Sequence, residues 1–170
     1  MKAEELKTEI SKALDEFTRL VQLLNDEQLN TSQGEGRWTA GELAQHVALA
    51  TQSWTPEQTK KADRPYDKYE NEIRELFLNQ EIKMQSPPFI VPEHKEYTLS
   101  DIVKELKWNK HAVIKSIDEN DLTEIILDME LPDWGFLSRY EWFILMLYHT
   151  QRHTQQLYNM ASAMHVAVTA

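Results

Sequence analysis

The sequence predicts an all-α fold, an antiparallel four-helix bundle with a long crossover connection. Two observations support it. Only four Gly and six Pro occur among the 170 residues, which disfavours a turn-rich sandwich or barrel. Four segments carry apolar residues at three- and four-residue steps, the period of an amphipathic helix. The length suits one domain, which we expect to span residues 1–170, and the absence of Cys excludes disulfides.

The first two helices are predicted from apolar stripes and a capping signal. Glu4 to Leu24 has the pattern of one long amphipathic helix, and the sequence from 25 to 37 interrupts it. Thr39 and Glu42 have the spacing of a capping box, so the second helix is expected to begin at Thr39. Its predicted buried face consists of Leu43, Val47 and Ala50.

The middle of the chain, from Trp54 to Pro92, has a weaker pattern. Tyr66 to Leu78 is expected to form an accessory helix, because Ile73 and Phe77 lie four residues apart. Gln85 to Phe89 contains two prolines, and this segment is predicted to be an extended connection.

The last two long helices are also predicted from caps. Ser100 is the expected N-cap of the third, whose core stripe consists of Val103, Leu106, Val113 and Ile117. Leu122 to Leu131 is a connector with a short extended piece at Ile125 to Leu127. Ser138, three residues before Glu141, opens a fourth helix that runs to about Met160.

The charge balance excludes several classes of partner. Eighteen basic residues against 28 acidic ones give a net charge of −10, which argues against nucleic acid and anionic membranes. The first five residues contain no apolar core of a secretory signal. No uncharged apolar run approaches the ~18 residues of a membrane span. We therefore expect a soluble, cytoplasmic protein.

Three of the six histidines are predicted to meet in the core. His46 lies on the apolar side of the second helix, and His149 and His153 lie one turn apart on the stripe of the fourth. A buried polar group without a partner costs about 1–3 kcal/mol, and a metal ion would satisfy all three imidazoles at once. Three such ligands leave coordination positions open, as in catalytic metal sites.

Interpretations that need no metal ion also remain open. Each core histidine could instead be satisfied by a backbone carbonyl or a carboxylate, in a bundle without metal. His94, His111 and His165 are expected on the surface. No catalytic residue is identified: there is no Cys, and Thr150 after His149 excludes an H-E-x-x-H protease motif.

Side chains near the predicted site have two interpretations each. Gln156, three residues after His153, either orients an imidazole or is a polar residue at the bundle edge. Trp38 is expected to staple the helix entry onto the core rather than to bind a ligand. Four further aromatic residues either wall a pocket or pack in the core: Trp134, Tyr140, Trp142 and Tyr148.

Two segments resemble motifs of the DinB-like superfamily. Trp38 to Val47 reads WTAGELAQHV and resembles the W-S/T-x-x-E-x-x-x-H-L segment of that family. His149 to Leu157 reads HTQRHTQQL and resembles its closing H-x-x-x-H helix. Val47 stands where the family usually has Leu, a change that should matter only for packing. The resemblance covers about residues 4–162.

The resemblance implies a four-helix bundle in which His46, His149 and His153 bind a divalent metal ion. Zinc or nickel is expected first, with manganese or iron as further candidates. Family members with known activity include thiol-dependent S-transferases and isomerases that use bacillithiol, mycothiol or glutathione. The family's name reflects induction by DNA damage rather than DNA binding, in agreement with the charge.

Two hypotheses of function follow. The first is a metal-dependent enzyme of the thiol-dependent S-transferase type, with a small-molecule substrate and a low-molecular-weight thiol as partners; a hydrolase is a variant of it. The alternative is a non-catalytic metal-binding or stress-related interaction protein of the same fold. A homodimer is the default expectation for such a bundle.

Overall fold

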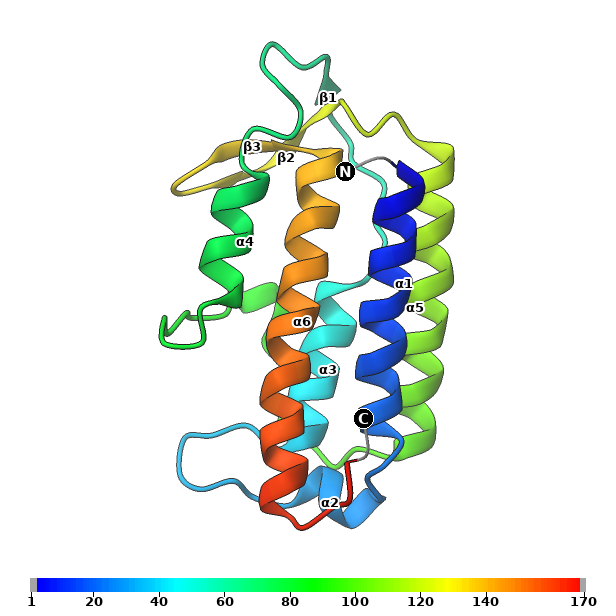
Figure 1. Cartoon of the computed structure of the whole chain (residues 1–170), viewed down its shortest axis with the longest axis vertical. Helices are drawn as coiled ribbons and strands as arrows, with labels where there is room; N and C mark the ends of the chain where they lie inside the picture. The colour runs from blue at the N-terminus through cyan, green and yellow to red at the C-terminus, as the bar shows by residue number, and fades with distance from the viewer. Residues whose placement is uncertain (1–2, 169–170) are drawn as a thin grey trace.

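Four long helices lie side by side in the computed structural model, which describes residues 3–168 (Figure 1). They are α1 (Ala3–Val21), α3 (Ala40–Ala50), α5 (Leu99–Glu119) and α6 (Arg139–Ala163). α1 packs against α5 and α6, and α3 packs against the same two helices. α1 and α6 run in one direction and α3 and α5 in the other, so the neighbours α3 and α5 are parallel (Figure 1). A long connection between these two helices is therefore required.

A small sheet corrects the all-α expectation. β1 (Thr59–Lys60), β2 (Ile125–Leu131) and β3 (Gly135–Ser138) form an antiparallel sheet in the order β1-β2-β3. The sequence indicated only Ile125 to Leu127 as extended. The strand extends further because β3 pairs with it: Leu131 pairs with Gly135, whose φ of +66° suits the tight turn between them.

The shorter helices and the caps refine the predicted boundaries. They are α2 (Asp26–Asn30), α4 (Glu70–Leu78) and the 3₁₀ helix η1 (Pro88–Ile90). The capping boxes at Thr39 and Ser138 are confirmed. The predicted cap at Ser100 is wrong: the Thr98 hydroxyl accepts the Asp101 N–H, and Ser100 lies inside the first turn of α5. The accessory helix α4 begins at Glu70 rather than at 66, and α6 continues to Ala163.

The predicted apolar stripe of α1 is buried, and the core consists of two clusters. Tyr148 belongs to the cluster that includes Leu6 and Ile144, whereas Leu157 belongs to the cluster that includes Phe17 and Val47. The segment of α6 that carries His149 and His153 therefore lies between the two apolar clusters.

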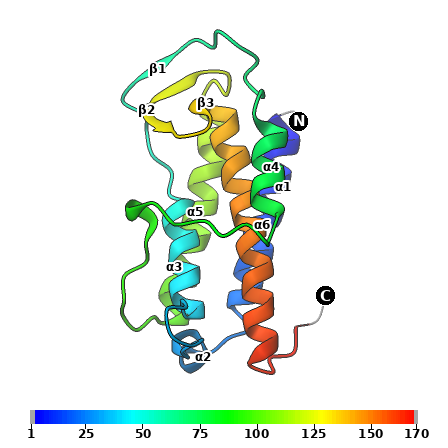
Figure 2. The same cartoon turned by 90° about the vertical axis from the view of Figure 1, so that its left-hand side faces the viewer.

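Residues 79–98, here called the crossover segment, connect α4 to α5. The segment leaves the end of α4, passes across to α3, where η1 lies, and descends to the start of α5 (Figure 2). Tyr97 packs so closely on α3 that a Cβ at Gly41 would lie 2.8 Å from its ring. Gly41 thus permits the crossover segment to dock on the helix that carries His46.

Within residues 3–168, no helix has both the length and the apolar character that crossing a membrane requires.

Candidate metal centre

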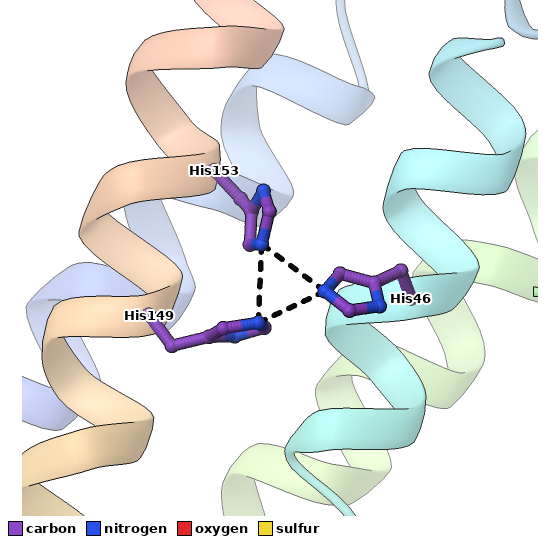
Figure 3. Close-up of side chains that lie close together, drawn as sticks. All are labelled: His46, His149 and His153. Atoms are coloured by element: carbon purple, nitrogen blue, oxygen red, sulfur yellow. Dashed lines mark hydrogen bonds between the residues drawn. The ribbon is translucent and has the colours of Figure 1, made fainter. Parts of the chain in front are cut away.

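The three predicted histidines meet between α3 and α6 (Figure 3). The Nε2 atom of His46 lies 2.9 Å from that of His149 and 3.1 Å from that of His153. The Nε2 atoms of His149 and His153 are 3.1 Å apart. All three side chains are buried, with 2%, 6% and 8% of their surface exposed in sequence order. The structure therefore brings together the residues that the sequence singled out.

These separations fit three ligands of one ion. Nitrogens bound to the same zinc ion at its usual bond length are about 2.9 Å apart at a right angle and about 3.4 Å apart at the tetrahedral angle. The observed separations of 2.9 and 3.1 Å lie at and just above the shorter value. The three rings reach this arrangement from two helices, with α6 contributing the pair one turn apart.

His46 and His153 each form a hydrogen bond through Nδ1, on the side of the ring away from the other histidines. This leaves the Nε2 lone pairs of these two rings facing each other. His46 Nδ1–H donates to the carbonyl of Ile90 at 2.7 Å, and His153 Nδ1–H donates to Gln156 Oε1 at 2.8 Å. A neutral imidazole has one N–H, so the Nε2 atoms of both rings are acceptors. Two lone pairs at 3.1 Å repel each other, and a cation between them relieves that repulsion.

Burial favours the neutral, metal-competent form of each ring. Desolvation lowers the pKa of His46, although the bond to the Ile90 carbonyl partly opposes it. Burial, reinforced by the neighbouring imidazoles, lowers the pKa of His149 well below its usual value and that of His153 to about 3. Because a metal ion requires unprotonated nitrogen, the three rings are ready to bind one at neutral pH.

The orientation of His46 depends on α3 and on the crossover segment. The capping box of Thr39 and Glu42 fixes the start of α3 about two turns before His46. Trp38, predicted to staple the helix entry, is half-buried and also lies against the imidazole of His46, with ring centroids 4.8 Å apart. Ile90 of η1 provides the carbonyl that fixes its tautomer. No sequence pattern indicated the role of Ile90, because every residue has a backbone carbonyl.

Gln156 orients the imidazole of His153, which is one of the two roles that its sequence position suggested. Its Oε1 accepts from His153 Nδ1, which holds that ring with Nε2 directed at the other two. His149 differs from the other two: among residues 3–168, its Nδ1 is buried without a hydrogen-bond partner. The ring of Phe77 on α4 lies against it, with centroids 5.9 Å apart.

Arg152, between the two histidines of α6, connects this helix to the crossover segment. Its guanidinium donates to the carbonyls of Phe77 at 3.2 Å, Asn79 at 2.6 Å and Ile82 at 2.6 Å. The side chain is buried, and desolvation lowers its pKa. Arg152 was noted in the sequence only as a neighbour of the histidine pair, because its acceptors lie about 70 residues away along the chain.

The remaining histidines are on the surface, as predicted. His94, His111 and His165 are exposed. His94 nevertheless contacts α3, since its Nδ1 lies 2.6 Å from Glu42 Oε1.

The four aromatic residues considered as pocket walls pack within the fold. Tyr140 and Tyr148 are buried in one core cluster, and Trp134 and Trp142 pack against that cluster. Trp142 also meets Trp54 edge to face, with ring centroids 5.6 Å apart.

Comparison with known proteins places this site in a family context. The model of the DinB superfamily matches residues 9–157, a span that contains all three histidines. A search of curated proteins gave no match. Among solved structures, the chain is similar to a DinB-like protein from Bacillus cereus ATCC 10987. The sequence identity is 16%, the TM-score is 0.57, and the match covers 93% of this chain and 89% of the other. At that identity the likeness concerns the fold.

Proposed function

Because this chain belongs to the DinB superfamily, we propose that it is a metal-dependent enzyme in which three histidines hold a divalent ion that activates a thiol. The ligands are His46, His149 and His153, and zinc or nickel is the proposed ion, with manganese or iron as further candidates. The proposed substrates are a low-molecular-weight thiol and a small organic electrophile. The thiol would lose its proton, and its sulfur would bond to a carbon of the electrophile as the leaving group on that carbon departs.

The observation that carries the proposal is the all-histidine ligand set with converging Nε2 atoms. When bound, a divalent ion on three neutral ligands supplies Lewis acidity and lowers the pKa of a thiol that binds beside them. The protein holds the proposed ligands in place: Ile90 and Gln156 fix two of the rings, and all three side chains are buried.

The lack of a carboxylate favours a thiol over water as the nucleophile. Within residues 3–168, the group of side chains placed to hold the ion consists of the three histidines alone. Hydrolytic zinc sites of the H-E-x-x-H type use a glutamate as general base. A thiol, with an ordinary pKa of about 8.5, needs far less help to ionise than water, whose pKa is about 15.7.

Metal content is the first test. Purified protein, incubated with zinc or nickel and dialysed, should contain close to one ion per chain by elemental analysis. His46→Ala should lose most of it, because two imidazoles hold a divalent ion poorly. His111→Ala is the matched control and should retain the wild-type content, since His111 is exposed on α5. Wild-type protein without metal would refute the proposal.

Turnover is the second test. Glutathione, bacillithiol and cysteine are each incubated with 1-chloro-2,4-dinitrobenzene, and the thioether is followed by its absorbance. Metal-loaded protein should accelerate the reaction with at least one thiol, and chelator or His46→Ala should abolish the acceleration. Equal rates with and without chelator would refute thiol activation by the metal.

A non-catalytic metal-binding protein is the second candidate, favoured by the same lack of a general base. It predicts one ion per chain together with no turnover across a broad panel of thiols and electrophiles. The two tests together therefore separate an enzyme from a binding protein.

A further inference from the structure

We propose that the crossover segment provides an apolar binding surface for the organic part of a small molecule whose polar end binds at the metal centre. The surface, here called the apolar rim, consists of Leu78, Ile82, Met84, Phe89 and Val91. The inference rests on the proposed metal centre and goes beyond it by assigning a substrate class: compounds with an uncharged alkyl or aryl body.

Exposed apolar side chains are concentrated in this one stretch of the chain. Five of the nine large hydrophobic side chains that are exposed among residues 3–168 lie between positions 78 and 91. Their exposed fractions are 39% for Leu78, 36% for Ile82, 38% for Met84, 60% for Phe89 and 46% for Val91. Glu81 and Lys83 are the two charged residues between positions 78 and 91, and residues 84–92 contain none. Exposed apolar side chains gathered in one stretch of the chain mark a candidate binding surface.

The backbone of the rim contacts His46, through Nδ1 of its ring, and Arg152, the neighbour of His153. At one end, Phe89 and Val91 flank Ile90, whose carbonyl accepts from His46. At the other, the Ile82 carbonyl accepts from Arg152, the residue before His153. Adjacent Cα atoms are about 3.8 Å apart, so these rim residues lie within a few ångströms of atoms that contact the ligands or their helix. Figure 2 shows the crossover segment running from the end of α4, which packs on α6, across to α3.

Hydrogen bonds anchor the crossover segment at the start of the rim and beyond its end. Arg152 fixes its first part through the carbonyls of Asn79 and Ile82. Beyond the rim, Tyr97 exchanges two hydrogen bonds of 2.8 Å with the side chain of Asn30. Apolar side chains on a fixed backbone bind a ligand without a large ordering cost.

The chemistry of the rim selects the ligand class. The rim side chains offer methyl, thioether and aromatic groups. One exposed cation, Lys83, lies between Ile82 and Met84, and residues 84–92, which include Phe89 and Val91, carry no charge. The alkyl or aryl group of the bound molecule would cover the rim. A sulfur or oxygen atom of the same molecule would bind at the proposed metal centre. The proposed electrophile is therefore apolar.

The test uses straight-chain hydroxamates, whose polar end binds zinc, from acetohydroxamate to octanohydroxamate. Calorimetry measures their affinity for zinc-loaded protein. Affinity should rise by up to about fourfold for each methylene that the rim buries, and by at least about tenfold across the series. Phe89→Ser should remove most of this gain without changing the affinity for acetohydroxamate.

Trp108→Ser is the matched control, because Trp108 is 74% exposed and belongs to α5, a helix that lies across the bundle from α4 (Figure 1). It should leave the dependence on chain length unchanged. Val91→Ser is the second rim variant and should act like Phe89→Ser. Equal affinity for all hydroxamates, or a chain-length dependence that survives in both rim variants, would overturn the rim while leaving the metal centre intact. Failure of acetohydroxamate to bind would instead overturn the metal centre and the rim with it.

Discussion

Acid should destabilise the metal-free protein through its buried histidines. Burial lowers the pKa of His153 to about 3 in the folded state, whereas a histidine in the unfolded chain has a pKa of about 6.5. Between these values the unfolded state binds a proton that the folded state does not. The free energy of unfolding is therefore highest above pH 6.5, and it falls as the pH is lowered toward 3.

The size of the effect follows from the same two pKa values. Each pH unit between them costs about 1.4 kcal/mol per histidine, so lowering the pH to 5 removes about 2 kcal/mol through His153 alone. Burial lowers the pKa of His46 and His149 in the same direction, and their contributions add to the loss. A domain with a total stability of about 5–15 kcal/mol will show such a loss clearly.

Urea unfolding at pH 7 and pH 5, with chelator present, measures this loss. Wild type should lose at least about 2 kcal/mol, and His153→Gln should lose about 2 kcal/mol less than wild type does. His111→Gln, a change at an exposed histidine, should behave as wild type. If His153→Gln and wild type show the same loss, His153 is not buried in its neutral form and the reasoning fails.

Three further variants test the contacts around the site. Gln156→Ala removes the acceptor 2.8 Å from His153 Nδ1 and should weaken zinc binding about tenfold in a competition titration with a chelating indicator; unchanged affinity would contradict its orienting role. Arg152→Met removes three hydrogen bonds to carbonyls and should lower the free energy of unfolding, measured in urea, by about 2–4 kcal/mol. A loss below about 1 kcal/mol would show that these three hydrogen bonds contribute little to stability. Thr98→Ala should cost about 1 kcal/mol in thermal unfolding and Ser100→Ala less than about 0.5 kcal/mol; the reverse order would restore Ser100 as the cap of α5.

The parts of the fold that depend on local pattern could be predicted from the sequence. Helix geometry alone places His149 and His153 on one face, and the apolar residues around His46 place it on the core side of α3. The capping box of Thr39 and Glu42 is likewise a short-range pattern. These features need no knowledge of how distant segments pack.

The parts that depend on distant pairing could not be predicted. β2 extends to Leu131 only because β3 pairs with it, and β1 joins from a segment more than 60 residues earlier. The partners of Arg152 and His46 are backbone carbonyls, which every residue has, so no residue type marks Ile82 or Ile90 for this role. Thr98 and Ser100 are both good capping residues, and tertiary docking of the crossover segment decides between them.

The three candidate ligands differ in what orients them, and the difference bears on how the site assembles. His153 is oriented by Gln156 on its own helix, so its geometry forms with α6. His46 is oriented by Ile90, whose carbonyl arrives only when the crossover segment docks on α3. Arg152 ties the other end of that segment to the helix of the remaining two ligands. Docking of the crossover segment therefore sets the tautomer of His46 and connects α3 to α6, the two helices that carry the candidate ligands. This segment, rather than either helix alone, completes the candidate metal centre.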